Sequence, residues 1–301
     1  MKDFQHLLGP MRLPFLILTP ACVLVGLGTA LWTTGHIDFL YSLLAPIGAL
    51  AAHISVNAFN EYFDFKSGLD MRTQRTPFSG GSGTLPQMPV LARQTLLTAI
   101  LAALLDVLIG LYFLFVWGWG ILPLGLMGLL VVIAYTPWLT RSPVACLIAP
   151  GLGFGTLMVM GTHFVLTGTY AWPAFWASLV PLLLVSDLLL LNQFPDVEAD
   201  GTVGRRHFPL VIGRQKSSVI YGVFLFLAYL SLVVGVLLGQ LPPLVLLGLL
   251  TLVLAVPTAI GVHRNAESIE QLVPLMGKNV LINILTPLLV AVGLIIAAMM
   301  G

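Results

Sequence analysis

The chain has 301 residues, of which 58% are hydrophobic and only 8% are charged, whereas about 25% of the residues in an average soluble domain are charged. With a mean hydropathy of +1.01, this composition excludes a soluble globular protein, a disordered chain and a protein that only lies on a membrane surface. The net charge of +1 provides no clustered basic excess for binding nucleic acid. We therefore expect an all-α integral membrane protein that forms a single domain over residues 1–301.

Apolar segments of sufficient length define the predicted membrane spans. A helix needs about 20 predominantly apolar residues to cross the hydrocarbon core of a bilayer. Nine segments meet this requirement, namely residues 10–34, 38–62, 93–116, 119–139, 143–167, 172–194, 217–238, 241–262 and 276–300. Some contain glycine or proline, which neighbouring helices in a bundle tolerate. The sequence therefore predicts a bundle of nine transmembrane helices.

The positively charged residues indicate how these helices are oriented. All 13 lysines and arginines, from Lys2 to Lys278, fall on one side of the membrane if the nine helices alternate in direction. The connections on the opposite side contain none. Because an excess of Lys and Arg marks cytoplasmic loops, we predict a cytoplasmic N-terminus and an outside C-terminus in a multi-pass protein of the inner (plasma) membrane.

Polar residues gather where the second predicted helix ends. Asn57, Asn60, Glu61 and Asp64 belong to the end of this helix, and Asp70 follows in the connection. At 3.6 residues per turn, Asn57, Asn60 and Asp64 lie on one helix face. A polar side chain in the bilayer costs about 2–3 kcal/mol or more unless it is paired. Such a concentration therefore indicates a functional site.

The sixth predicted helix ends in a similar pattern. Asn192 and Asp196 repeat the Asn-x3-Asp spacing, and Asp200 lies one further turn along if the helix persists. The two patterns end helices that are four apart in the alternating series and so run in the same direction, which places both patterns on the same side of the membrane. The match predicts an internal repeat of a four-helix unit, to which a ninth helix is added.

The residue types at these two helix ends favour a particular cation. Oxygen ligands without matching His or Cys are typical of a hard cation, and Mg²⁺ is commonly held by one or two carboxylates together with water and substrate phosphates. Two facing acidic clusters repel each other unless cations and a polyphosphate lie between them. The two long connections carry basic residues that can bind phosphate oxygens, namely Lys66, Arg72, Arg75, Arg205 and Arg206.

These patterns resemble the two signature motifs of the UbiA superfamily of intramembrane prenyltransferases, and the resemblance covers most of the chain. Within the superfamily the spacing is most similar to that of the 1,4-dihydroxy-2-naphthoate polyprenyltransferases of menaquinone synthesis. The resemblance implies a Mg²⁺-dependent enzyme that transfers a polyprenyl group from an isoprenyl diphosphate to an aromatic acceptor, such as dihydroxynaphthoate. It also implies an active site that opens to the cytoplasmic side.

The resemblance implies roles for individual residues as well. The residues expected to act in catalysis are Asn60, Asp64, Asn192 and Asp196. Those expected to hold the metal are Asn60, Asp64, Asp70, Asp196 and Asp200. Those expected to bind substrate are His53, Asn57, Lys66, Arg72, Arg75, Tyr135, Arg141, Arg205 and Arg206.

The chain departs from the family pattern at three places. Glu61 stands where the family usually has Asp. Five residues separate Asp64 from Asp70 instead of three, so we expect Asp70 to reach the site from a loop. The family's Tyr-x3-Lys sequence is represented by Tyr135 with Arg141 further along.

Two glycine-rich stretches have simpler interpretations than nucleotide binding, because neither matches a phosphate-loop signature. We interpret residues 80–83 as a flexible cap over the active site. We interpret the glycines at positions 151, 153 and 155 as sites of close helix packing.

Other functions remain open at this point. A solvated helix end explains any single carboxylate, although not the repeated pattern. A secondary transporter with a cytoplasmic cation site also has repeats and intramembrane acids, but here the acids cluster at helix ends. The Asp-Gly-x2-Ala-Arg signature of a phosphatidyl-group transferase is not met by residues 200–205. A prenyltransferase with a different aromatic acceptor is a further alternative.

Overall fold

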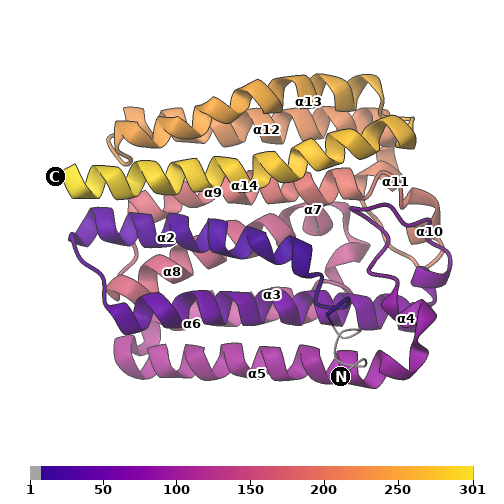
Figure 1. The fold of residues 1–301 in the computed structure, drawn as a ribbon, viewed down its shortest axis with the longest axis horizontal. Helices are drawn as coiled ribbons and strands as arrows, with labels where there is room; N and C mark the ends of the chain where they lie inside the picture. Colours follow the sequence, from indigo (N-terminus) through magenta and orange to yellow (C-terminus); the bar gives the residue numbers. More distant parts are fainter. Residues whose placement is uncertain (1–7, 301) are drawn as a thin grey trace.

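A computed structural model describes residues 8–300, and within this range all regular structure is helical (Figure 1). Lys2, which supports the predicted orientation, lies outside the described residues. The longer helices are α2 (Leu18–Thr34), α3 (Phe39–Ser67), α5 (Ala92–Trp117), α6 (Leu122–Ala134), α7 (Pro143–Leu152), α8 (Met158–Thr167), α9 (Trp172–Asn192), α12 (Arg214–Leu237), α13 (Leu252–Arg264) and α14 (Ile269–Met300). The short ones are α4 (Thr84–Gln87), α10 (Val197–Gly201) and α11 (Phe208–Ile212), and the 3₁₀ turns are Leu13–Ile17, Leu69–Met71, Pro89–Leu91, Gly118–Ile121, Leu139–Arg141 and Pro243–Thr251.

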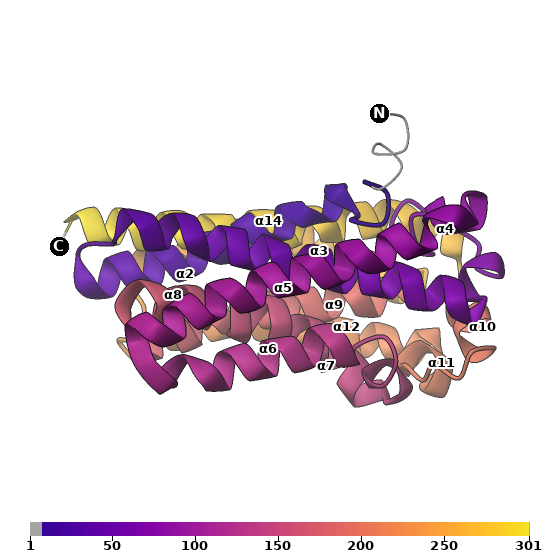
Figure 2. The same ribbon diagram turned by 90° about the horizontal axis from the view of Figure 1, so that it is seen from below.

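By length and composition, eight helical segments among the described residues are able to span a membrane, one fewer than predicted. The difference arises because the predicted spans 93–116 and 119–139 lie in one helical run of 46 residues, Pro89–Ala134. Within this run the backbone of Gly118 adopts a φ of +70°, and α6 returns beside α5 (Figure 2). Helix α6 has 13 residues and ends at Ala134, and the 3₁₀ turn Gly118–Ile121 precedes it directly with 4 more, so the returning segment is near the lower length limit of about 17 residues for a span.

The core of the bundle lies around α9, which packs against α12, α14, α7 and α2. Its fully buried leucines Leu184, Leu190 and Leu191 belong to the main apolar cluster. At the periphery, α5 buries only Thr95, Ala99 and Phe113, and many of its other apolar side chains are exposed, among them Leu101, Leu108 and Phe115, as expected where lipid replaces water as the solvent. Backbone hydrogen bonds within each helix satisfy the polar groups that lipid cannot.

Close packing between α7 and α9 depends on glycine, as the sequence predicts. A Cβ atom added to Gly151 would lie 1.9 Å from the backbone oxygen of Leu182. One added to Gly155, in the π-helical turn Gly153–Leu157, would lie 2.3 Å from the backbone nitrogen of the same residue. Neither glycine leaves room for a side chain, so these positions set how closely the two helices approach.

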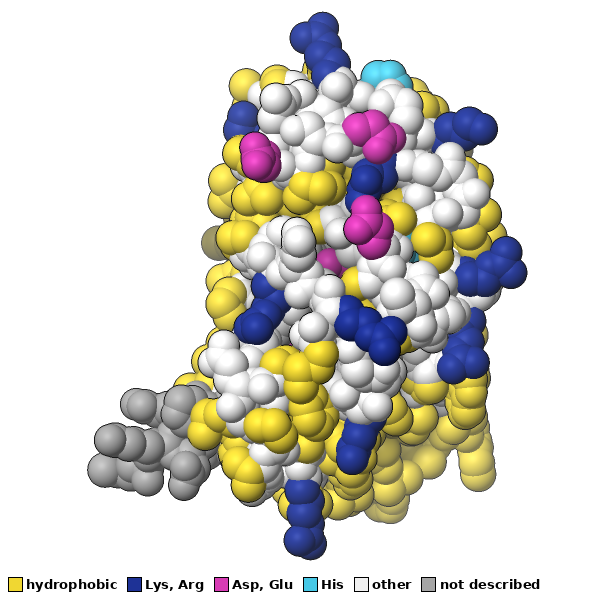
Figure 3. Space-filling view, turned by 90° about the vertical axis from the view of Figure 1, so that its right-hand side faces the viewer, with side chains coloured by type: hydrophobic (Ala, Val, Ile, Leu, Met, Phe, Trp, Pro, Cys, Tyr) yellow, Lys and Arg dark blue, Asp and Glu magenta, His cyan; other side chains and the backbone are white. Residues whose placement is uncertain are grey.

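Both acidic segments lie at the same end of the bundle, which we call the acidic end. It is the right-hand end in Figure 1, where α4, α10 and α11 are found. Viewed directly, this end presents many Lys and Arg side chains and a smaller number of Asp and Glu side chains (Figure 3). The two segments identified in the sequence therefore belong to one surface of the molecule.

Candidate active site

The first acidic segment is divided between a helix and a turn. Helix α3 continues to Ser67, so Asn60 and Asp64 lie in its last two turns. Gly68 then ends the helix with a φ of +77°, and its N–H donates to the Asp64 and Phe65 carbonyls. This left-handed C-cap, which favours glycine, leads into the turn Leu69–Met71 and returns Asp70 toward α3. Asp70 therefore lies outside the helix, as its spacing predicts.

In the second acidic segment the helix does not persist to Asp200. Helix α9 ends at Asn192, and a new short helix, α10, begins at Val197. Pro195 explains the break, because proline lacks an N–H and disfavours a helical conformation in the residue before it, Phe194. Asp196 therefore lies in the turn between the two helices, while Asp200 is buried within α10.

A cavity of about 530 Å³ brings the two segments together. Ten of the predicted site residues line it, namely His53, Asn57, Asn60, Asp64, Asp70, Tyr135, Asn192, Asp196, Asp200 and Arg205. Along α3 the lining extends from Asp64 to Ala45, a distance of ~28 Å at 1.5 Å per residue, which is close to the thickness of the hydrocarbon core. The part away from the acids is lined mainly by apolar residues of α5, α6 and α8. We call this part the apolar lobe.

Five predicted substrate-binding residues do not line the cavity. All five are exposed, namely Lys66, Arg72, Arg75, Arg141 and Arg206. Lys66 lies over the ring of Tyr62, with 5.8 Å between Nζ and the ring centroid. The backbone N–H of Arg206 donates to the carbonyl of Thr140 over 2.8 Å.

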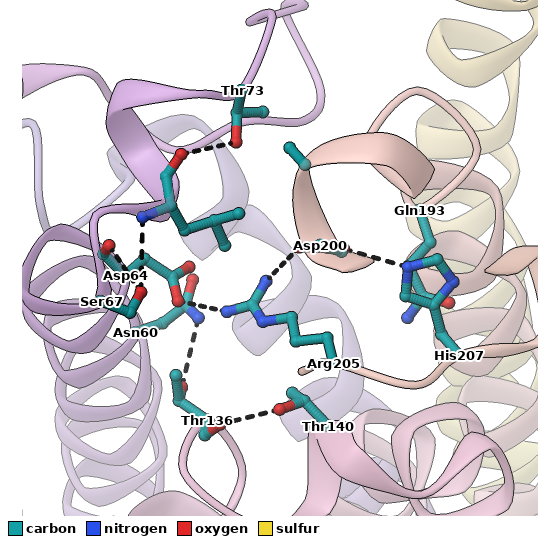
Figure 4. A network of polar contacts seen from close by, with 12 residues as sticks. Asn60, Asp64, Ser67, Thr73, Thr136, Thr140, Gln193, Asp200, Arg205 and His207 are labelled. Atoms are coloured by element: carbon teal, nitrogen blue, oxygen red, sulfur yellow. Dashed lines mark hydrogen bonds and ion pairs between the residues drawn. The ribbon is translucent and has the colours of Figure 1, made fainter. Parts of the chain in front are cut away.

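Arg205 joins the two acidic segments directly (Figure 4). One of its terminal nitrogens donates to Asp64 Oδ1, and the other donates to Asp200 Oδ1 over 3.0 Å. Gly204, with a φ of +79°, turns the chain so that the Arg205 N–H also donates to the Asp200 carbonyl. The guanidinium group therefore lies between two carboxylates that are 136 positions apart in the sequence.

His207 completes the hydrogen bonding of Asp200. Its Nδ1 accepts from the backbone N–H of Leu210 over 3.3 Å, which leaves the ring proton of the neutral form on Nε2. That nitrogen lies 3.1 Å from Asp200 Oδ2. Both oxygens of Asp200 are thus engaged, and His207 is only 1% exposed.

Glu61 has a different environment from the other acids. Its carboxylate accepts from the backbone N–H and the hydroxyl of Ser82, each over 2.7 Å, and from Arg12 Nε over 2.8 Å. Arg12 also donates to Asn60 Oδ1 over 2.9 Å. The residues around Ser82 are the glycine-rich stretch 80–83, which Glu61 therefore anchors to the site.

Sequence reasoning did not identify Arg12, Ser82 or His207 as site residues. Arg12 is the one non-glycine residue between positions 8 and 300 with a positive φ, at 52°. Such backbone strain in a polar residue is typical of functional sites, but it leaves no pattern in the sequence. Ser82 and His207 lie beyond the two acidic segments in the sequence, and only the fold brings them into contact with Glu61 and Asp200.

Several oxygens in the cavity have no hydrogen-bond partner in the described structure. They are Asp70 Oδ2, Asn192 Oδ1 and Asp196 Oδ1, and all are buried. Burial, and after it the nearby charges of Asp64 and Glu61, raises the pKa of Asp70 to about 7. Burial and then the charge of Asp200 raise the pKa of Asp196 to about 7. A cation that approached these oxygens would favour their ionised form.

The donor set fits a hard divalent cation, although the side chains are not arranged as a complete metal site. No three His, Cys, Asp or Glu side chains converge on a metal position among residues 8–300. The unpartnered oxygens of Asp70, Asn192 and Asp196 nevertheless face one cavity. Mg²⁺ commonly takes only one or two carboxylates and completes its shell with water and phosphate oxygens.

The role of Glu61 as an anchor can be tested by proteolysis. We expect Glu61→Ala to increase the rate of trypsin cleavage after Arg72 and Arg75 about tenfold, because the segment loses hydrogen bonds to a charged acceptor worth ~1.5–3 kcal/mol each. Glu270→Ala, which removes an exposed carboxylate elsewhere, should leave the rate unchanged. Equal cleavage of the two variants would contradict the anchoring role.

Together, the fold and the cavity define a multi-pass membrane protein with a polar site at one end of a long apolar cavity. The sequence profile described as the UbiA prenyltransferase family matches residues 20–276. The chain therefore belongs to the UbiA prenyltransferase family, and it is a prenyltransferase.

Comparison with characterised relatives agrees with this assignment. The chain is 27% identical to a 1,4-dihydroxy-2-naphthoate octaprenyltransferase of Bacillus subtilis over 93% of its length and 89% of that protein. It is 28% identical to the Escherichia coli enzyme of the same name over 75% of each chain. It is also 25% identical to a digeranylgeranylglyceryl phosphate synthase of Pyrococcus furiosus over 62% of its length and 63% of that protein.

Solved structures share the fold. A UbiA homologue from Aeropyrum pernix K1 in its apo form superposes with a TM-score of 0.72 at 14% identity, over 93% of this chain and 97% of that one. A UbiA homologue from Archaeoglobus fulgidus, bound to DMAPP and Mg²⁺, superposes with a TM-score of 0.57 at 11% identity, over 95% and 99% of the two chains.

Proposed function

We propose that this protein transfers a polyprenyl group from an isoprenyl diphosphate to 1,4-dihydroxy-2-naphthoate in menaquinone biosynthesis, with Mg²⁺ as its cofactor. The observation that carries the proposal is the shared cavity, which has two acidic segments at one end and an apolar lobe behind them. Such a cavity suits a molecule with an anionic head and a long apolar tail. The names of the Bacillus subtilis and Escherichia coli relatives support the naphthoate acceptor.

We further propose that the whole chain is one domain of nine spans, with the acidic end on the cytoplasmic side of the inner membrane. In this topology α5 and α6 cross separately, and the four-helix repeat relates α3 to α9. The many Lys and Arg side chains at the acidic end support this orientation. The exposed Lys66, Arg72, Arg75, Arg141 and Arg206 would attract the anionic substrate toward the cavity.

The site residues would have different roles according to where they lie in the cavity. The metal ligands would be Asn60, Asp64, Asp70, Asp196 and Asp200, with Asn192 beside them. Mg²⁺ bound there would neutralise the negative charge that develops on the departing pyrophosphate. Arg205 would bind phosphate oxygens. His53, Asn57 and Tyr135 would contact the acceptor from the cavity wall.

The residues around His53 support a positioning role for that side chain. Its Nδ1 lies 2.8 Å from the hydroxyl of Thr19, and its ring meets that of Phe154 edge-to-face at 4.6 Å between centroids. These contacts hold the imidazole in one orientation, with its remaining edge available to the cavity that it lines. A fixed polar edge in an apolar wall is suited to orienting a hydroxylated aromatic ring.

The proposed reaction moves the prenyl group from a diphosphate oxygen to a ring carbon of the acceptor. The C–O bond of the prenyl diphosphate breaks, and pyrophosphate leaves with the electron pair. A ring carbon of the acceptor then bonds the allylic carbon. With dihydroxynaphthoate, the carboxylate on that ring carbon leaves as CO₂ and returns an electron pair to the ring. The enclosed apolar lobe would keep water away from the allylic cation.

A direct assay tests this function. Purified protein is incubated with Mg²⁺, a labelled prenyl diphosphate and either dihydroxynaphthoate or hydroxybenzoate. We expect a prenylated naphthalene product that requires Mg²⁺ and is lost when EDTA is added. Transfer only to hydroxybenzoate would overturn the acceptor assignment, and transfer to neither acceptor would overturn the proposed function.

Glycines in the apolar lobe should set which prenyl chains fit. A Cβ atom added to Gly128 on α6 or to Gly161 on α8 would meet open space, and both residues line the cavity. Gly128 lies ~10 Å along α6 from Tyr135, beyond the reach of a single isoprene unit. We expect Gly128→Leu and Gly161→Leu to raise the KM for a long polyprenyl diphosphate about tenfold and to leave dimethylallyl diphosphate turnover unchanged.

Gly222 provides the matched control for these variants. A Cβ at this position also meets open space, but Gly222 lies on α12 and does not line the cavity. Gly222→Leu should therefore change neither KM. Equal effects of the cavity variants on long and short substrates would contradict a length-selective role of the lobe.

A further inference from the structure

Arg205 occupies oxygens that the proposed function requires for the cation. Its guanidinium binds Asp64 Oδ1 and Asp200 Oδ1, which belong to different acidic segments. A guanidinium group and a divalent cation carry the same sign of charge and seek the same carboxylate lone pairs. They cannot share those two oxygens at full strength, so binding of one weakens binding of the other.

Other carboxylate oxygens in the cavity have no contact with Arg205. Asp70 Oδ2 and Asp196 Oδ1 are buried, line the same cavity and have no partner in the described structure. A cation that bound only at these oxygens would lack the contributions of Asp64 and Asp200. Coordination by Asp64 Oδ1 and Asp200 Oδ1 therefore requires Arg205 to leave these two oxygens.

A diphosphate provides the place to which Arg205 can move. Phosphate oxygens bind a guanidinium at least as well as carboxylates do, often through two parallel hydrogen bonds. The side chain of Arg205 is 17% exposed and lines the cavity, so it has room to turn toward a bound anion. Its backbone stays fixed through the hydrogen bond from its N–H to the Asp200 carbonyl.

We propose that Arg205 competes with the cation for the carboxylates of Asp64 and Asp200. It frees these carboxylates for the cation only when a diphosphate accepts its guanidinium. This inference rests on the proposed function. In this arrangement the cation alone binds weakly, and the cation and the diphosphate bind cooperatively through one side chain. By thermodynamic linkage each ligand raises the affinity for the other by the same factor.

Equilibrium dialysis of the full-length protein in detergent with Mn²⁺ tests the inference, with and without inorganic pyrophosphate and with correction for Mn²⁺–pyrophosphate complexes. We expect Arg205→Gln to bind Mn²⁺ alone about tenfold more tightly than the natural protein. We also expect the factor by which pyrophosphate enhances Mn²⁺ binding to fall about tenfold in this variant, within the usual range of coupling between sites. Arg205→Lys, which keeps the charge but not the two-pronged contact, should lie between them.

Arg264→Gln is the charge-matched control, because Arg264 is an exposed arginine on α13 and contacts none of these carboxylates. It should leave both Mn²⁺ affinities unchanged. Size-exclusion profiles report folding, and Arg205→Lys carries the test if Arg205→Gln does not fold. Unchanged or weaker binding of Mn²⁺ alone in the Arg205 variants would overturn this inference while leaving the proposed function intact. Failure of the natural protein to bind Mn²⁺ even with pyrophosphate would overturn both.

Discussion

Replacing Asp64 or Asp196 by Asn should reduce Mg²⁺-dependent prenyl transfer about 10³-fold while leaving the protein folded and membrane-inserted. Each substitution keeps the shape of the side chain but removes its negative charge. Loss of one charged ligand and of the transition-state stabilisation that it supports is worth ~4 kcal/mol, which corresponds to this factor in rate. The measurement is the rate of product formation at saturating prenyl diphosphate over a range of Mg²⁺ concentrations.

Asp38 supplies the control for these variants. It is the N-cap of α3, at the opposite end of the same helix from Asp64, and its side chain accepts from the Tyr41 N–H. Asn is an equally good N-cap, so Asp38→Asn should retain both stability and activity. Undiminished turnover in Asp64→Asn or Asp196→Asn would refute the role that we assign to the carboxylate concerned.

The second large effect concerns stability. We expect Gly151→Ala and Gly155→Ala each to destabilise the protein by about 3 kcal/mol, at the upper end of the usual range for overpacking. The added Cβ would overlap the backbone of Leu182 at 1.9 Å and 2.3 Å respectively. A backbone cannot rotate away as a side chain can, so α7 and α9 would have to separate. Thermal unfolding in detergent, monitored by loss of the monodisperse size-exclusion peak, measures the change.

Gly153 lies between these two positions and serves as their control. The nearest atom to a Cβ at Gly153 is Val131 Cγ1 at 3.8 Å, an ordinary van der Waals contact. Gly153→Ala should therefore unfold at the temperature of the natural protein. If all three variants unfolded at the same temperature, the close approach of α9 would not be the reason for the glycines at positions 151 and 155.

Local patterns were sufficient to predict much of the fold and part of the candidate site. Hydropathy predicted the helical class, and the two Asn-x3-Asp patterns predicted which helix ends would line one cavity. The spacing of Asp64 and Asp70 predicted that Asp70 would come from a turn. These features depend on a few neighbouring residues, which the sequence displays directly.

Other features depend on contacts between distant segments or on competing local signals. Arg12 precedes an apolar helix and has the appearance of an ordinary flanking charge, yet in the folded chain it pairs with Glu61. The periodicity of the acids left open whether the helix persists to Asp200, and Pro195 decides against it, because α9 ends at Asn192 and α10 begins at Val197. The predicted fourth span was too long, because the apolar run continues past the point where α6 ends at Ala134.

Helix α3 carries Asn60 and Asp64, which we assign to the metal, near one end, and it lines the apolar lobe along much of its length. In the proposed function, this single helix would therefore fix the distance between the reacting groups and the hydrocarbon tail. The opposite walls, supplied by α5, α6 and α8, hold none of the acids that we assign to the metal. Substitutions in α5, α6 and α8 can therefore change which isoprenoid the cavity admits without altering the residues that we assign to the metal.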